Sequence, residues 1–244
     1  MPEVIFTGPA GRIEGRYHPA PQKNAPIAII LHPHPQFGGT MNHQIIYQMY
    51  YAFVHRGFAA IRFNFRGVGR SQGSFDHGTG ELSDAASALD WAQSINPEAR
   101  SCWIAGFSFG AWIGMQLLMR RPEIEGFISI APPANLYDFS FLAPCPSSGL
   151  FVHGTQDRVA PAKEVLDPLL GPCRPGRFVR REQHLRRREP GADVFGQFAP
   201  AAPGQDDVGH EQVDARARRG GQVVQAGIGR GGARHERVEQ RTHL

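Results

Sequence analysis

Cysteine is scarce in this chain of 244 residues. The three cysteines, Cys102, Cys145 and Cys173, fit none of the clustered spacings of zinc sites, and their odd number argues against a disulfide framework. These spacings predict no zinc site, and we expect no cofactor of any kind.

Long apolar runs are also lacking. No run approaches the roughly 20 residues that a membrane-spanning helix needs. The first ten residues hold Glu3 and no basic residue, unlike the charged-then-apolar layout of a signal peptide. We therefore expect a cytoplasmic protein with no membrane partner, and the sequence leaves homo-oligomerisation open.

Charge and aliphatic content divide the chain in two. Residues 1–170 hold ten Arg and two Lys against 13 acidic residues, a net charge of −1, whereas residues 171–244 hold 14 Arg and no Lys against nine acidic residues, a net charge of +5. The second segment has no Met, Trp or Tyr, only one Ile and two Leu, and 12 Gly. Such a segment buries too little apolar surface to offset its ordering entropy. We predict a core domain over 1–170 and an extension over 171–244 that is disordered or aberrant.

Two explanations of this extension remain open. It is either a natural basic arm or the product of a shifted reading frame that replaced the normal C-terminus. We favour the second, because the preceding domain lacks its final strand and helix.

Strand and helix signals alternate up to residue 170. The run Ile27–Leu31 is apolar throughout, as in a strand buried on both faces. The expected strands are Val4–Thr7, Arg12–Tyr17, Ile27–Leu31, Phe58–Phe65, Cys102–Ala105, Phe127–Ile130 and Leu150–Val152, and the expected helices are Gln44–His55, Leu82–Ile95 and Ala111–Met119. This alternation predicts an α/β fold with a mostly parallel twisted sheet, helices on both faces, and an incomplete C-terminal strand and helix.

The segment Gly106–Gly110 reads Gly-Phe-Ser-Phe-Gly and lies between an apolar strand and an apolar helix. In that context the G-x-S-x-G pattern forms a sharp turn that exposes the serine hydroxyl at a helix N-terminus, whose dipole favours developing negative charge. The alternative is a glycine-rich turn with an incidental serine, which the context disfavours. Ser108 is thus predicted to be a nucleophile.

Two backbone N–H groups are candidates for an oxyanion hole. One belongs to Phe109, the residue after the nucleophile. The other is expected in the loop of residues 32–40, where two prolines lack N–H groups, so that His34 is the first candidate and Gln36 the fallback. A metal role for the two histidines of this loop is disfavoured, because no third ligand is evident.

A carboxylate follows the strand Leu150–Val152. Asp157 lies on the turn after that strand, 49 residues past Ser108, where an Asp can orient and charge-stabilise a base histidine. The alternative is an Asp that only caps its turn. Asp138 is a weaker rival for the acid.

Four segments together resemble one known family. They are Leu31–Met41, Asn64–Gly73, Gly106–Gly110 and Val152–Asp157, within a region that covers about 70% of the chain, 170 of 244 residues. Residues 1–170 resemble a small α/β-hydrolase of the dienelactone-hydrolase-like, minimal-cap kind. The resemblance implies the α/β-hydrolase fold, a Ser-Asp-His triad and small ester, lactone or thioester substrates.

The base histidine is the part of this pattern that the sequence does not clearly supply. The resemblance implies a histidine after Pro-Gly-Ala and a polar residue, but Val194 follows Pro190–Asp193 here. His184 is the best remaining candidate, although its Arg-rich surroundings favour a solvated histidine without a role.

Two classes of function follow. The first is a serine hydrolase of small carboxylic esters that forms an acyl-enzyme. The second is a catalytically impaired α/β-hydrolase scaffold whose basic tail binds an acidic partner. Nucleic acid is disfavoured as that partner, because the tail lacks the interleaved aromatic residues used for base stacking.

Overall fold

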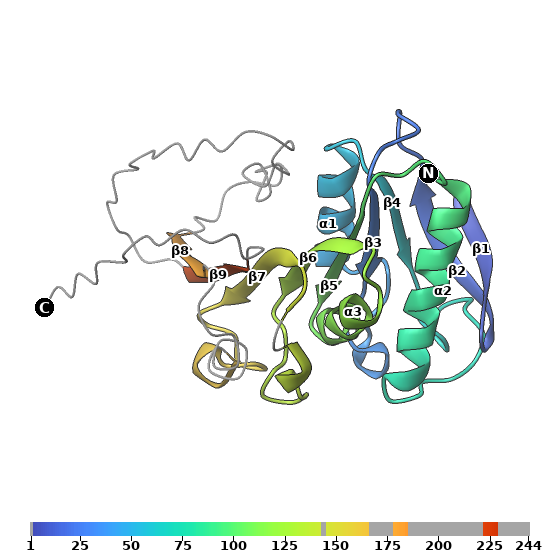
Figure 1. Ribbon diagram of the computed structural model, residues 1–244. Helices are drawn as coiled ribbons and strands as arrows, with labels where there is room; N and C mark the ends of the chain where they lie inside the picture. The colour runs from blue at the N-terminus through green and yellow to red at the C-terminus, as the bar shows by residue number, and fades with distance from the viewer. Residues whose placement is uncertain (1, 143–144, 166–177, 185–221, 229–244) are drawn as a thin grey trace, which may run out of the picture.

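A computed structural model describes residues 2–142, 145–165, 178–184 and 222–228 (Figure 1). The elements in chain order are β1 (Glu3–Gly8), β2 (Gly11–His18), β3 (Ile27–Leu31), the 3₁₀ helix η1 (Pro35–Phe37), α1 (Gln44–Val54), β4 (Ala59–Phe63), α2 (Thr79–Ile95), β5 (Cys102–Phe107), α3 (Phe109–Arg120), β6 (Ile124–Ile130), the 3₁₀ helix η2 (Ser140–Leu142), β7 (Ser148–Gly154), β8 (Phe178–His184) and β9 (Gln222–Ile228). None of the helices in these ranges is long and apolar enough to span a bilayer.

The described strands form one sheet in the order β1-β2-β4-β3-β5-β6-β7-β9-β8, which runs from right to left in Figure 1. β1 and β2 form an antiparallel hairpin, and β2 is antiparallel to β4. The strands β4, β3, β5, β6 and β7 are mutually parallel, which confirms the mostly parallel sheet. Their C-terminal ends therefore meet at one edge, where open α/β sheets bind ligands.

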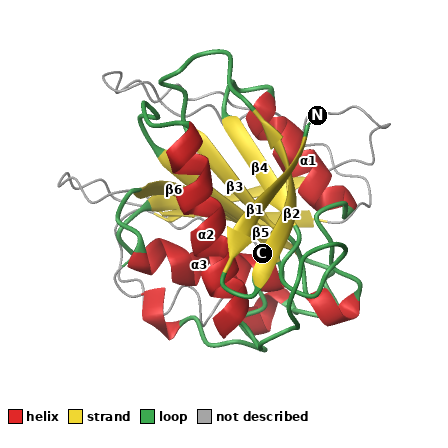
Figure 2. Cartoon of the chain, turned by 90° about the vertical axis from the view of Figure 1, so that its right-hand side faces the viewer, coloured by secondary structure: helices red, strands yellow, loops and turns green. Residues whose placement is uncertain are grey.

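Helices cover both faces of the sheet, as predicted. α1 packs on one face against β3, β4 and β5, whereas α2 and α3 pack on the other (Figure 2). β3 shows why: all five of its residues are buried, with Ile27, Ile29 and Leu31 in the core under α2 and α3, and Ala28 and Ile30 in the core under α1. A strand buried on both faces needs the continuous apolar run seen in the sequence.

α2 begins three residues before its predicted start. The carboxylate of Glu81 accepts hydrogen bonds from the backbone N–H groups of Asp76 (2.9 Å) and Gly78 (2.7 Å), and these bonds fix the first turn. The apolar periodicity that predicted the helix begins only at Leu82, so it missed this polar cap.

Two segments of the predicted extension are strands. β9 pairs antiparallel with β7, and β8 pairs antiparallel with β9, so the sheet continues past β7. Neither segment was among the expected strands, although Phe178–Val179 and Val223–Val224 are residue types that favour strands. The boundary near residue 170 remains a prediction, since the other residues of 171–244 lie outside the described ranges.

Candidate active site

Ser108 occupies the turn between β5 and α3. Its backbone has φ 54° and ψ −119°, a conformation that non-glycine residues rarely adopt and that persists only when the surrounding structure enforces it. Its N–H donates to the carbonyl of Ile130 on β6 at 2.9 Å, and its own carbonyl accepts from Ala111 at 2.9 Å. The turn is thus anchored to β6 and α3, and the partly exposed Ser108 lies at the C-terminal end of β5, as predicted.

Both glycines of the turn are required, because other backbone segments lie too close to them to leave room for a Cβ atom. A Cβ at Gly106 would overlap the backbone of Gly110, and a Cβ at Gly110 would overlap the carbonyl oxygens of Leu31 and His32. The sharp turn therefore depends on glycine at both positions.

Phe109 begins α3, and the first N–H groups of a helix have no intrahelical acceptor. Its side chain is 1% exposed. Five rings surround it, with centroid distances of 4.9 Å to His34, 6.0 Å to Phe65, 5.9 Å to Phe75, 5.7 Å to Trp112 and 6.0 Å to Tyr137. This packing fixes the backbone next to the nucleophile.

His34 lies in the loop after β3 and caps η1. Its Nδ1 accepts the N–H of Gln36 at 3.2 Å, so the fallback oxyanion donor is already engaged. Burial lowers the pKa of His34, which favours the neutral ring with its hydrogen on Nε2. The ring contact with Phe109 brings the loop beside the Ser108 turn.

His32 has a structural role. The side chain is fully buried, its Nδ1–H donates to the carbonyl of Pro33 at 2.6 Å, and its Nε2 accepts the N–H of Phe65 at 3.0 Å. Burial lowers the pKa of His32 to about 4, so the ring is neutral. The ring thus ties the end of β3 to the end of β4. In the described part of the chain no group of three His, Cys, Asp or Glu residues could hold a metal ion.

Asp157 lies on the turn after β7 and is partly exposed. Its Oδ1 accepts the N–H groups of Val159 (2.9 Å) and Ala160 (3.0 Å), and Nε2 of the buried His153 donates to the carbonyl of Ala160 at 2.7 Å. The turn is therefore fastened to β7. Only β6 separates β7 from β5, and the usual strand spacing puts the ends of these two strands roughly 10 Å apart.

Asp138 is exposed and is committed to its own loop. One carboxylate oxygen accepts the N–H of Ser140 at 2.8 Å and the other accepts its hydroxyl at 2.9 Å. These bonds lower the pKa of Asp138. The carboxylate caps η2 in this arrangement.

His184 is the last residue of β8, and its side chain lies outside what the structure describes. β6, β7 and β9 separate β8 from β5, a distance on the order of 19 Å at the usual strand spacing. The described strands therefore do not bring His184 to Ser108. The other histidines of the extension, and Val194, fall outside the described residues.

Two arginines of the loop after β4, Arg66 and Arg70, brace that loop. Arg66 donates through Nε and a terminal nitrogen to the buried carboxylate of Asp84 on α2, at 3.0 and 2.8 Å. Arg70 donates through Nε to Glu14 at 2.9 Å. Both guanidinium groups are thus committed to carboxylates.

The aromatic rings around Phe109 are the site residues that sequence reasoning missed. Phe75, Trp112 and Tyr137 come from three segments, and Trp112 stacks on Tyr137 with centroids 4.4 Å apart. No local motif links such residues. The sequence feature that could have indicated an aromatic cluster is the pair Phe107 and Phe109, which flank Ser108.

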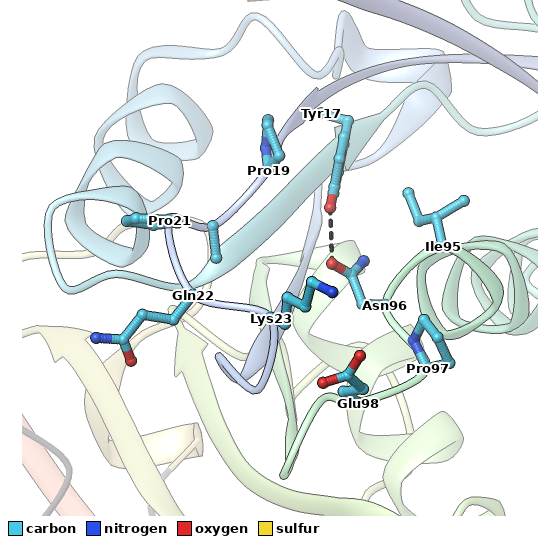
Figure 3. A pocket seen from close by; sticks show the side chains of 10 residues that line it. Tyr17, Pro19, Pro21, Gln22, Lys23, Ile95, Asn96, Pro97 and Glu98 are labelled. Atoms are coloured by element: carbon cyan, nitrogen blue, oxygen red, sulfur yellow. Dashed lines mark hydrogen bonds between the residues drawn. The ribbon is translucent and has the colours of Figure 1, made fainter.

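A hollow of about 390 Å³ lies at the opposite end of the sheet (Figure 3). It is lined by residues 17 and 19–23 and by residues 95–98, with the Tyr17 hydroxyl donating to Asn96 Oδ1 at 2.9 Å. These residues precede the starts of β3 and β5, whereas Ser108 follows the end of β5. The hollow therefore does not belong to the candidate site.

The fold and the comparisons define an α/β-hydrolase of the serine hydrolase type. Residues 16–167, more than half of the chain, match the family described as X-Pro dipeptidyl-peptidase (S15 family), and the chain belongs to this family within the α/β-hydrolase superfamily.

Three relatives illustrate the similarity. An uncharacterized protein of Rickettsia prowazekii (strain Madrid E) is 56% identical over 189 residues, which are 76% of this chain and 77% of the relative. A crystal structure of a protein of unknown function from Agrobacterium tumefaciens, described as an α/β hydrolase, is 72% identical with a TM-score of 0.68 and covers 70% of this chain and 79% of its own. A Xanthomonas campestris structure, described as an α/β serine hydrolase without lid, is 34% identical with a TM-score of 0.62 and covers 68% of this chain and 76% of its own.

Proposed function

We propose that this protein hydrolyses small carboxylic esters through an acyl-enzyme intermediate on Ser108. The observation that carries the proposal is the enforced backbone conformation of Ser108 at the start of α3, next to the Phe109 N–H and the His34 loop. A strained residue held by its surroundings at a strand end is a hallmark of functional sites.

The chemistry assigned to these residues is acyl transfer. The Ser108 oxygen attacks the ester carbonyl while a base takes its proton, and the carbonyl oxygen becomes an oxyanion that accepts hydrogen bonds from the N–H groups of Phe109 and His34. Collapse of this intermediate expels the alcohol, which takes up the proton, and leaves the acyl group on Ser108. Water then attacks the acyl-enzyme and releases the acid.

Asp157 is proposed as the acid that orients the base. One of its oxygens holds the turn, and its place beyond β6 leaves the room that an imidazole needs. Asp138 is disfavoured because Ser140 occupies both of its oxygens. His184 remains the candidate base within the sequence, and the proposal for Ser108 does not depend on it.

A small ester substrate suits an open site. The connection between β6 and β7 is short, and the Xanthomonas relative is described as lacking a lid. The matching family is described as X-Pro dipeptidyl-peptidase, so the test below also compares an X-Pro peptide amide with the ester.

The test is a burst experiment with p-nitrophenyl acetate. We expect stoichiometric release of p-nitrophenol and an acetyl adduct on Ser108 by peptide mass analysis, both lost in Ser108→Ala. Ser94→Ala is the matched control, because that hydroxyl only donates to Trp91 on α2. An adduct on another residue, or a burst that survives in Ser108→Ala, would overturn the assignment of Ser108 as the nucleophile. Faster turnover of an X-Pro anilide than of the ester would show that the preferred substrates are peptides. Absence of any adduct would favour the impaired scaffold.

The assignment of the acid is tested by Asp157→Asn beside Asp138→Asn. The amide oxygen introduced by the first substitution still accepts the N–H groups of the turn, so this change removes charge and leaves the turn in place. In a protein whose C-terminal segment supplies the base histidine, we expect Asp157→Asn to lower ester turnover at least about tenfold, with Asp138→Asn close to the parent protein. The reverse result would make Asp138 the acid.

A further inference from the structure

The three most exposed large apolar side chains of the described residues lie at the edge of the sheet that holds Ser108. They are Phe37 (85% exposed), Val159 (70%) and Leu136 (63%), and we call them the apolar rim. They follow β3, β7 and β6 respectively, so they extend from the C-terminal strand ends. The other exposed large apolar residues, Ile5, Tyr47 and Ile95, lie elsewhere on the fold and are less exposed.

Contacts place the rim on both sides of the nucleophile. The ring of Phe37 lies 4.7 Å from that of His34, which in turn lies 4.9 Å from that of Phe109. On the other side, the Asn135 side chain donates to the carbonyl of Val159 at 3.1 Å, which joins the loop of Leu136 to the turn of Asp157. The sheet order β3-β5-β6-β7 sets Ser108, after β5, between the two sides.

Exposed apolar side chains that gather beside a concave or reactive site commonly mark where a ligand binds. An ester whose carbonyl carbon meets Ser108 must direct its acyl chain outwards across one side of this turn. Each methylene that such a chain buries can favour binding by up to about fourfold. A polar or very short acyl group would leave the rim in water.

We propose that the preferred substrates are esters of medium-length aliphatic acids, whose acyl chain packs against one side of the apolar rim, either Phe37 or the pair Leu136 and Val159. This inference rests on the proposed ester hydrolysis at Ser108 and adds the class of acyl group. The rim determines specificity and takes no part in bond making.

The test compares p-nitrophenyl acetate, butyrate and octanoate. For the unchanged protein, kcat/KM should rise from acetate to octanoate. The combined variant Phe37→Ser, Leu136→Ser, Val159→Ser should lower the octanoate-to-acetate ratio at least about tenfold. The control Ile5→Ser, Ile95→Ser removes exposed apolar side chains away from the site and should leave the ratio unchanged. Each rim residue is also replaced singly, so that the result does not depend on one multiple variant.

A binding experiment separates the rim from the chemistry. Octanoate and acetate are titrated calorimetrically into Ser108→Ala, with and without the three rim substitutions. Tighter binding of octanoate that is lost with the rim supports the proposal even if no ester is turned over. Hydrolysis without any chain-length preference overturns the rim and leaves the proposed function standing. Rim substitutions that dissociate a dimer without changing the preference also overturn it, because the rim would then be a subunit interface.

Discussion

Gly110 illustrates how the candidate site is fixed residue by residue. A Cβ at this position would meet the carbonyl oxygens of Leu31 and His32, and backbone atoms cannot move aside as a flexible side chain can. Gly114, one turn further along α3, differs: its added Cβ would meet only side-chain carbons of Ile104 and Leu31, at 3.4 Å.

We therefore predict that Gly110→Ala lowers the free energy of unfolding by about 1–3 kcal/mol, the usual cost of overpacking. Gly114→Ala should leave stability unchanged or raise it by up to about 1 kcal/mol, because alanine favours the helix. Urea unfolding followed by circular dichroism measures both. Equal stability of the two variants would contradict the close approach of the Leu31 and His32 carbonyl oxygens to Gly110.

His32 makes a second residue-scale prediction, on pH. Its pKa falls from 6.5 in the unfolded chain to about 4 in the folded protein, so the unfolded state binds the proton more readily between these values. The neutral His32 ring contributes fully to the free energy of unfolding above pH 6.5. This contribution is lost progressively as the pH falls towards 4, by about 3 kcal/mol in all.

Urea unfolding at pH 7 and pH 5 should show this loss, and His32→Gln should reduce the difference between the two pH values. Gln retains one donor and one acceptor but does not titrate. His43→Gln serves as the control, since that ring is partly exposed and buries less of its charge. A pH dependence that is identical in the His32 variant and the unchanged protein would refute the argument.

At the scale of elements, the link between α2 and the loop after β4 depends on one ion pair. The Asp84 carboxylate is fully buried and accepts from both the guanidinium and the backbone N–H of Arg66. Removing its charge would leave a largely buried guanidinium with the mostly exposed carboxylate of Asp76, at 3.8 Å, as its remaining ion-pair partner.

Asp84→Asn should accordingly cost about 3–5 kcal/mol of unfolding free energy. The matched control is Asp90→Asn on the same helix. Asp90 pairs with Arg121, but its side chain is 63% exposed, so we expect a cost under about 1 kcal/mol. Thermal and urea unfolding provide the comparison, and a small effect at Asp84 would mean that the loop does not depend on the pair.

The elements also show how far the sequence could predict this molecule. β3 matches its predicted bounds, because a strand buried on both faces has an unbroken apolar run. The positions of Ser108 and Asp157 were predictable, because each follows a strand through a turn with its own local signature. The ring cluster around Phe109 was not, since it joins residues distant in sequence. β9 was missed because its short apolar run, with Val223, Val224 and Ile228, lies in an Arg- and Gly-rich segment, and the strand pairs with the distant β7.

At the scale of the whole molecule, the extension decides whether the catalytic machinery is complete. We propose that residues 171–244 supply no oriented base, because a base acts only when packing and a hydrogen bond fix its ring. His184 ends a strand that β6, β7 and β9 separate from β5.

The final prediction replaces this extension. A chimaera that joins residues 1–170 to the C-terminal segment of the Agrobacterium relative should hydrolyse p-nitrophenyl butyrate at least about a hundredfold faster than the unchanged chain, since loss of a base alone costs far more than that in serine hydrolases. Ser108→Ala in the chimaera should remove the gain, which separates restored catalysis from improved folding. His184→Ala in the unchanged chain should have little effect. If His184→Ala instead abolished substantial activity, or if the chimaera folded but hydrolysed the ester no faster, the prediction would be wrong and residues 171–244 would supply the base.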